Sequence, residues 1–165
     1  MDFTVDVIRS PEEAGPVRVL FKEYAASLGI DLGFQHFQEE LDHLPGHYCP
    51  PSGILLLARA GREAAGCAAL HRLSSDTGEL KRLYVRDICR HMGLGNLLIR
   101  TVLGRAVKMH YRYVRLDTLP SMGAAQKMYE KWDSMILILM YIIRCRERGI
   151  WKWICTGQPR MSEAA

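Results

Sequence analysis

Residues 79–98 read Glu-Leu-Lys-Arg-Leu-Tyr-Val-Arg-Asp-Ile-Cys-Arg-His-Met-Gly-Leu-Gly-Asn-Leu-Leu, and they predict a strand, a short turn and a helix that opens with two glycines. The strand residues alternate between two expected faces, Leu80, Arg82 and Tyr84 on one and Lys81, Leu83 and Val85 on the other. After the turn, the spacing Arg90-x-x-Gly93-x-Gly95 brings backbone amides and the positive end of a helix to one place. Because glycine lets a ligand approach the backbone closely, this loop predicts a phosphate-binding site.

Two common phosphate-binding motifs do not match this loop. A dinucleotide fingerprint needs a third glycine, where this chain has Leu98, and a strand-borne acidic residue that is missing at the usual distance. A P-loop needs Gly-Lys-Ser/Thr, whereas Asn96 and Leu97 follow the glycines here. Both motifs are therefore rejected, and an ordinary glycine-opened helix remains the alternative to a phosphate site.

The loop resembles the pyrophosphate loop of the GNAT superfamily of acyl-CoA N-acyltransferases, in which Arg or Gln-x-x-Gly-x-Gly or Ala follows a strand. A second match lies downstream, where a strand is expected at 113–118 and a helix at 121–132. That helix resembles the family signature Ala-x-x-Leu/Phe-Tyr-Glu-Lys at Ala125, Met128, Tyr129, Glu130 and Lys131. One departure is Met122, which stands where the family often has an Asn that contacts the cofactor. The resemblance covers residues 3–131.

The remaining predicted elements follow the order of that family's fold. Strands are expected at 3–8, 54–60, 64–73 and 79–85, and helices at 34–44 and 93–110. Another helix is expected between an N-cap at Ser10 and a stop at Gly29. The continuous apolar run at 54–58 predicts a strand buried on both faces. The resemblance thus implies an α/β fold of GNAT type, with a mixed central sheet in the order β-α-α-β-β-β-α-β-α, in one domain spanning 1–165.

Composition excludes several other classes of protein. The chain has 165 residues, 48% of them hydrophobic, which suffices for one domain with a proper core. The net charge of +4 comes from scattered basic residues without an aromatic-basic platform, so no nucleic-acid partner is expected. The longest apolar run, 135–143, is too short to span a bilayer, and no secretion signal opens the chain. The five cysteines lack metal-ligand or disulfide spacing, so neither a metal nor disulfides are expected, and we expect the protein to be cytoplasmic.

After Lys131 the chain departs from the family, which continues with Leu-Gly-Phe, a strand, an Asn-Pro turn and a last strand. Back-translation with one base restored after Lys131 gives, in the neighbouring frame, an unbroken peptide that resembles this missing ending. We therefore hypothesise that a single-base deletion near codon 132 shifted the frame and made 132–165 an atypical, strand-like tail. The alternative is a diverged strand pair at 135–143 and 150–155. An out-of-frame apolar run would be prone to aggregation unless it pairs with a sheet edge.

The resemblance implies that acetyl-CoA lies where the strands on either side of the phosphate-binding helix separate. The residues expected to bind it are Leu83, Tyr84, Val85, Arg90, His91, Met92, Gly93, Leu94, Gly95 and Asn96. Glu79 matches a general base used by some members, often through water, or is a solvated acid at a strand end. Tyr129 matches the tyrosine that reprotonates the CoA thiolate, or is a core or interface residue.

Other polar residues have weaker assignments. Lys81 and Arg82 could receive a substrate carboxylate or belong to an ordinary charged strand face. Three histidines near the second helix, where the family forms its acceptor pocket, are His36, His43 and His47. Asp117 could orient substrate or cap a strand end, His91 could touch the cofactor, and His71 and His110 receive no role. Cys67 and Cys89 are expected to be buried small hydrophobes rather than nucleophiles.

The resemblance therefore predicts an acetyl-CoA-dependent N-acetyltransferase that acts on a primary amine of a small molecule, by direct attack. A non-catalytic acyl-CoA-binding protein and a protein or peptide N-acetyltransferase are the alternatives. A homodimer is plausible because dimers are common in the family.

Overall fold

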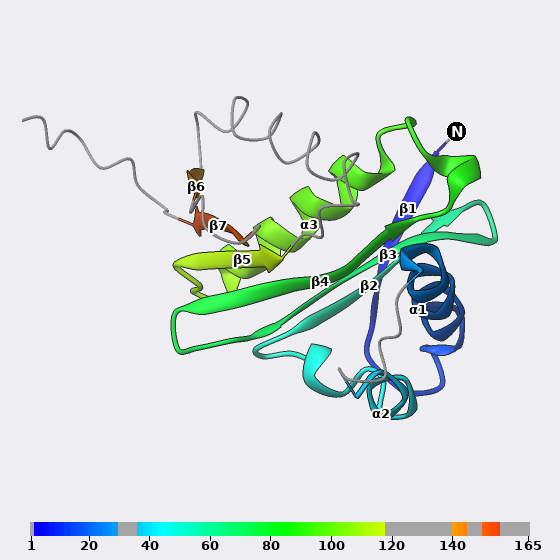
Figure 1. Ribbon diagram of the computed structural model, residues 1–165, viewed down its shortest axis with the longest axis horizontal. Coiled ribbons are helices and arrows are strands. Elements are labelled where there is room, and N and C mark those ends of the chain that lie inside the picture. Colours follow the sequence, from blue (N-terminus) through cyan, green and yellow to red (C-terminus); the bar gives the residue numbers. More distant parts are fainter. Residues whose placement is uncertain (1, 30–35, 118–139, 145–149, 156–165) are drawn as a thin grey trace, which may run out of the picture.

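The computed structural model describes residues 2–29, 36–117, 140–144 and 150–155, and it shows a twisted sheet with helices on both faces (Figure 1). The described strands are β1 (Phe3–Ile8), β2 (Ile54–Ala60), β3 (Glu63–Arg72), β4 (Thr77–Val85), β5 (Tyr113–Asp117), β6 (Met140–Arg144) and β7 (Ile150–Cys155). The described helices are α1 (Gly15–Leu28), α2 (Phe37–Asp42) and α3 (Leu94–Lys108), with short 3-10 helices at Gly46–Tyr48 and Asp87–Cys89.

The strands form one mixed sheet in the order β1-β2-β3-β4-β5-β7-β6. β1 to β4 are antiparallel neighbours, with short turns joining β2 to β3 and β3 to β4, and with α1 and α2 between β1 and β2. β5 and β7 are antiparallel as well. Among the described strands, only β4 and β5 pair in parallel, because α3 carries the chain back between them, as a parallel crossover requires. The α/β architecture and the predicted order of elements are confirmed up to β5; the expected helix at 121–132 lies outside the described residues.

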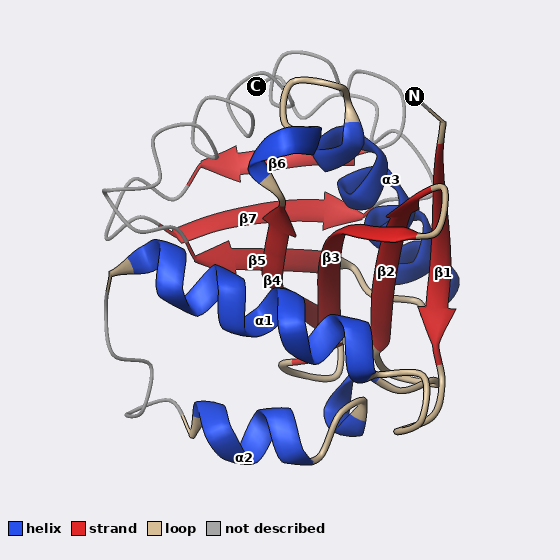
Figure 2. Ribbon diagram, turned by 90° about the vertical axis from the view of Figure 1, so that its right-hand side faces the viewer, coloured by secondary structure: helices blue, strands red, loops and turns tan. Residues whose placement is uncertain are grey.

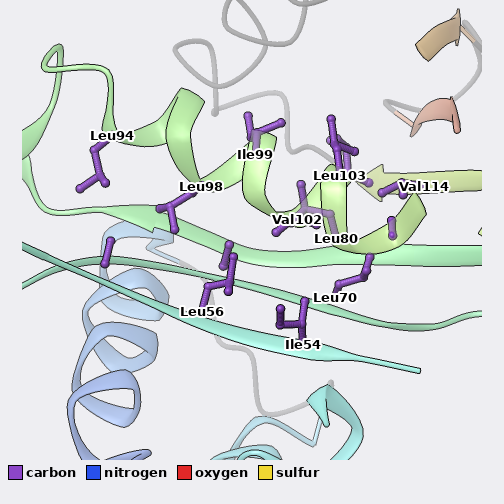
Figure 3. Packing of buried hydrophobic residues seen from close by; sticks show 14 of the residues in the cluster. Ile54, Leu56, Leu70, Leu80, Leu94, Leu98, Ile99, Val102, Leu103 and Val114 are labelled. Carbon is purple, nitrogen blue, oxygen red and sulfur yellow. The ribbon is translucent and has the colours of Figure 1, made fainter. Parts of the chain in front are cut away.

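Two apolar cores lie on opposite faces of the sheet. In Figure 2, α1 and α2 lie on the near face and α3 lies behind it. Ile54 and Leu56 of β2 join the core beneath α3, whereas Leu55 and Leu57 join the core beneath α1 and α2. All of these side chains are buried, so the predicted strand with two buried faces is confirmed. Figure 3 shows side chains of α3 packed against those of β2, β3 and β4 on its side of the sheet.

The start of α1 differs from the prediction. The helix begins at Gly15 with Pro16 in its first turn, and Ser10 lies outside it. Instead, the carboxylate of Glu13 accepts a hydrogen bond from the backbone N–H of Arg9. Either proline of the segment fits a first helical turn, and the chain uses the second. The end at Gly29 is confirmed, with a left-handed φ of 62° that suits glycine.

The tail contributes two strands to the far edge of the sheet. β7 covers the second half of the predicted strand pair and is hydrogen-bonded to β5, with β6 outside it. β6 spans Met140–Arg144, which agrees with the predicted strand at 140–143, and the predicted residues 135–139 lie outside the described residues. Among the described residues, no helix is both long and apolar enough to cross a membrane.

Candidate functional site

β4 and β5 separate soon after they begin. Their register contains Thr77↔Tyr113, Gly78↔Val114 and Glu79↔Arg115, yet β4 continues to Val85. Figure 2 shows β5 turning away from the direction of β4. Backbone groups of β4 beyond Glu79 that point toward β5 therefore have no partner in that strand. Since such groups need hydrogen bonds, this edge suits an extended ligand.

A β-bulge interrupts β4 at the start of the separated part. Cys67 pairs with Tyr84 and Ala69 with Lys81, so Arg82 and Leu83 together stand opposite one residue of β3. Arg82 has a φ of 55°, which is uncommon for a residue other than glycine. The extra residue reverses the alternation, and Leu83 joins Leu80 in the core beneath α3. The predicted face shared by Leu80, Arg82 and Tyr84 is therefore wrong.

A buried ion pair holds the bulge in place. The Nε and Nη2 atoms of Arg82 donate to the two carboxylate oxygens of Glu40 in α2, at 3.1 and 2.6 Å. Tyr48 donates its hydroxyl proton to the same carboxylate at 2.6 Å, and the Arg82 guanidinium lies 5.2 Å from the Phe37 ring centroid. Burial alone would raise the pKa of Glu40, but the hydrogen bonds from Arg82 and Tyr48 outweigh it, and the pKa is lowered. Because the Arg82 side chain is 4% exposed and bound to Glu40, it is not placed to receive a substrate carboxylate.

The predicted phosphate loop lies between β4 and α3. Gly93 caps α3 with a φ of 85°, and a Cβ atom there would meet no heavy atom within 4 Å. The first N–H groups of α3 have no intrahelical acceptor, and the helix dipole makes this end positive. Arg90 adds a guanidinium, which donates to the Val85 carbonyl at 3.2 Å and pairs with Asp87 at 2.7 Å. These donors fit a pyrophosphate, which would share Arg90 with Asp87.

The other residues of the loop differ in what they can offer a ligand. His91, Met92 and Asn96 are exposed. Leu94 is buried beneath α3, so only its backbone can reach a ligand. Leu83, Tyr84 and Val85 are partly buried along the separated edge of β4. The structure thus brings the predicted binding residues of β4, the loop and the start of α3 to one side of the sheet opening.

Glu79 lies inside β4 rather than at its start. It is the last residue of β4 that pairs with β5, opposite Arg115, and it stands opposite His71 of β3 on its other side. Its Oε2 atom lies 2.7 Å from Nε2 of His71. This hydrogen bond, more than the opposing effect of burial, keeps the pKa of Glu79 below its ordinary value. Glu79 is therefore a paired carboxylate that is 14% exposed, not a solvated acid.

Sequence reasoning missed the partners of the charged residues on β4. His71 received no role, although a hairpin centred on residue 75 places it opposite Glu79. The contact between Glu40 and Arg82 joins residues 42 positions apart, and no local pattern indicates it. Tyr129 and Met122 lie outside the described residues, and the side chain of Asp117 is not described.

The remaining histidines and cysteines are as follows. His36, His43 and His47 are all exposed. Cys67 and Cys89 are buried, as predicted, and burial raises the pKa of the Cys67 thiol. Within the described part of the chain, no cluster of His, Cys, Asp and Glu could hold a metal ion.

Comparison with known proteins identifies a family and individual proteins that this chain is similar to. Residues 19–133 match the model of the acetyltransferase (GNAT) family. An uncharacterized N-acetyltransferase of Schizosaccharomyces pombe is 33% identical over 133 residues, which cover 79% of this chain and 82% of the relative.

Solved structures share the fold. A GNAT-family acetyltransferase of Staphylococcus aureus has a TM-score of 0.71 at 16% identity, over 90% of this chain and 98% of that one. AAC(6')-Iy in complex with the bisubstrate analogue CoA-S-monomethyl-acetylneamine has a TM-score of 0.60 at 19% identity, over 79% of this chain and 89% of that one.

Proposed function

This chain belongs to the acetyltransferase (GNAT) family and is an N-acetyltransferase, and from that premise we propose that it transfers the acetyl group of acetyl-CoA to a primary amine of a small molecule. The observation that carries the proposal is the junction of two features. The edge of β4 beyond Glu79 is not paired with β5, and the glycine-capped start of α3 follows it in the chain. An extended chain that ends in a pyrophosphate, as CoA does, matches this order of binding groups.

Each proposed binding residue has a role that follows from its position. Backbone groups of Leu83, Tyr84 and Val85 would bind the pantetheine arm along the edge of β4. The pyrophosphate would bind the amides of 93–96 and the guanidinium of Arg90, with His91 and Met92 beside it. Acetyl-CoA supplies the activated thioester. The side chains of the site would therefore contribute positioning and proton transfer rather than a nucleophile.

Two residues are proposed for proton transfer. Glu79 would assist in removing a proton from the attacking ammonium, since it lies where β4 and β5 part. Tyr129 is proposed as the acid for the CoA thiolate on the family resemblance alone. We propose that the amine attacks acetyl-CoA directly. The described cysteines near the site, Cys67 and Cys89, are both buried and are therefore poorly placed to act as nucleophiles.

A small-molecule acceptor is the proposed substrate class. The structural relative AAC(6')-Iy binds an analogue in which CoA is joined to acetylneamine, which gives a precedent for a small amine on this fold. We propose further that the enzyme is cytoplasmic, uses no metal, and has neither a nucleic-acid nor a membrane partner. We propose a homodimer as the assembly, because dimers are common in the family.

Calorimetric titration with acetyl-CoA tests the proposed cofactor site. The wild-type protein should bind, and an Arg90→Glu, Gly93→Asp variant should bind at least about tenfold more weakly, because it loses a charged hydrogen bond and gains two negative charges. Arg9→Glu is the matched control, since Arg9 is exposed beyond the end of β1 that lies away from the loop. Equal binding by all three proteins would place the CoA site elsewhere.

A panel of primary amines, extended by peptide N-termini, then tests the acceptor class. Release of free CoA thiol with small amines, and not with peptides, is the expected result. Turnover of peptides alone would instead identify a protein or peptide N-acetyltransferase. Binding of acetyl-CoA without turnover of any amine would refute the proposed reaction.

A further inference from the structure

His71 and Glu79 form a hydrogen-bonded pair at the point where β4 and β5 separate. The two residues stand directly opposite each other on β3 and β4, with Nε2 of His71 2.7 Å from Oε2 of Glu79. Their side chains are 23% and 14% exposed, so the pair is largely enclosed but still reachable from solvent. Because Glu79 is the last residue of β4 that pairs with β5, the pair lies at the start of the opening between these strands.

The hydrogen bond determines which nitrogen of His71 carries the proton. A carboxylate can only accept a hydrogen bond, so Nε2 must be the N–H donor. In the neutral ring, Nδ1 then holds the free lone pair. No other described residue forms a hydrogen bond with this ring. Nδ1, which has no hydrogen-bond partner among the described residues, could accept a proton from a bound molecule.

A second contact fixes the plane of the ring. The His71 ring packs edge-to-face against Tyr48, with ring centroids 5.9 Å apart and an interplanar angle of 85°. Tyr48 is itself buried and held by its hydroxyl group, which donates to Glu40. His71 is thus positioned by the hydrogen bond from one nitrogen to Glu79 and by the packing of its ring against Tyr48, as a preorganised catalytic group should be.

The surroundings of Glu79 make its carboxylate a poor proton acceptor. The hydrogen bond from His71 lowers the pKa of Glu79, and the positive charges of Lys81 and Arg115 lower it further, against burial. A carboxylate with a lowered pKa is a weak base for an ammonium group. An imidazole ordinarily titrates near neutral pH, where a general base is most effective.

We propose that His71 is the catalytic base, accepting the ammonium proton of the substrate at Nδ1, and that Glu79 is a positioning residue that orients the ring and stabilises its protonated form. This inference rests on the proposed function and names the route of its proton. An N–H bond of the ammonium breaks as Nδ1–H forms. The freed nitrogen lone pair forms the bond to the acetyl carbon, and the C–S bond breaks. The second N–H bond of the nitrogen then breaks, and one proton reaches the thiolate through the proposed acid Tyr129 to form the S–H bond, so that His71 retains the other.

Replacement of each partner by glutamine distinguishes the two candidates for the base. His71→Gln keeps an N–H donor for Glu79 but has no basic nitrogen, so kcat/KM should fall about 10²–10⁴-fold. The limb of the pH profile in which kcat/KM rises with pH should vanish with it. Glu79→Gln should keep that limb, because the imidazole that accepts the proton is still present. His110→Asn is the matched control, because His110 is exposed after the end of α3 and asparagine tolerates its left-handed φ of 61°.

The opposite pattern would overturn the inference. If Glu79 were the base, Glu79→Gln would abolish the limb and His71→Gln would retain it. If His71→Gln kept both its activity and the rising limb of the pH profile, the role of His71 would be refuted and the proposed function would be unaffected. An absence of turnover by the wild-type protein on every amine would refute both.

Two further measurements keep the test independent of folding. Acetyl-CoA binding by His71→Gln should stay within about twofold of wild type, which separates loss of the base from loss of the site. Should that variant fail to fold, nitrogen-15 NMR of the histidine rings in the wild-type protein still decides. We expect the neutral His71 ring to carry its proton on Nε2, and a proton on Nδ1 would contradict the proposal.

Discussion

Replacing Glu40 with alanine should destabilise the protein far more than removal of any exposed acidic residue. The change leaves the Arg82 guanidinium without its carboxylate in a site where that side chain is 4% exposed. An uncompensated buried charge costs about 3–5 kcal/mol. The Tyr48 hydroxyl loses its acceptor at the same time, which adds a further ~1–3 kcal/mol if it finds no other. Because the two losses share one cavity, we expect a total near the upper end of the first range, about 5 kcal/mol.

Urea denaturation followed by circular dichroism measures this loss. With a slope of about 1–3 kcal/mol per molar urea, the midpoint should fall by roughly 2 M or more. Glu39→Ala is the matched control, because Glu39 is the neighbouring acid of the same helical turn and its side chain is 69% exposed. The ion pair between Glu39 and His36 is exposed, and such pairs contribute little to stability. The Glu39→Ala control should therefore lose less than about 1 kcal/mol of unfolding free energy.

An apolar replacement of the whole cluster tests the cause of the loss. Glu40→Leu, Arg82→Met and Tyr48→Phe together remove every charge and the hydroxyl group, and this triple variant should recover most of the stability. A Glu40→Ala variant no less stable than Glu39→Ala would refute the reasoning, since it would mean that water screens Arg82. A triple variant as unstable as Glu40→Ala would show instead that volume, not charge, dominates.

Three other changes have expected outcomes. Leu98→Ala removes a fully buried side chain of α3 and should cost about 2–5 kcal/mol in urea denaturation, against less than about 1 kcal/mol for the partly exposed Leu97→Ala. Gly66→Ala would bring a Cβ atom to 2.6 Å from the Tyr84 carbonyl oxygen and should lower the melting temperature, whereas Gly104→Ala, with open space around it, should raise it. Since the pKa of Glu40 is lowered in the folded state, its stabilisation is present above about pH 4.3 and lost on acidification, so the stability difference between wild type and Glu40→Gln should shrink from pH 6 to about pH 3.

The sequence predicted the strands well where an apolar pattern is bounded by a turn. β1 and β2 have their predicted bounds, and the turn at Gly61 sets the hairpin between β2 and β3. Helix ends were predicted less well, because a cap depends on local alternatives. At the start of α1, Ser10 and Pro11 carry the usual N-terminal signals, yet Glu13 binds the backbone of Arg9 and the helix begins later.

The bulge in β4 could not be predicted from alternation. Residues 79–85 alternate as a regular strand would, and Arg82 is a residue for which a positive φ is uncommon. The bulge is stabilised by the ion pair with Glu40 on α2, which lies 42 positions away from Arg82 in the sequence. Since the bulge reverses which side chains face α3, a distant ion pair determines the local pattern.

The candidate site shows the same contrast between local features, which the sequence predicts, and contacts between distant residues, which it does not. The phosphate loop could be predicted because its glycines and Arg90 act through adjacent backbone, which sequence spacing describes directly. The partner of Glu79 requires a hairpin register, and the prediction placed the strand ends at residues 73 and 79 rather than at Arg72 and Thr77. That shift left Glu79 at a strand end, where no cross-strand partner would be expected.

The tail shows that residues beyond the family match can complete this sheet. The match to the family ends at residue 133, two residues past the last one that the sequence resemblance includes. β7 nevertheless pairs with β5 through five residue pairs, Tyr113↔Ile154 to Asp117↔Ile150. Strand pairing uses backbone groups, so a tail of suitable β-propensity can cover this edge even if a lost base has changed every side chain. The proposed CoA-binding edge of β4, the loop and α3 all precede residue 117. We therefore infer that cofactor binding depends on the family-like part of the chain, and that a shifted frame after Lys131 would act mainly on stability.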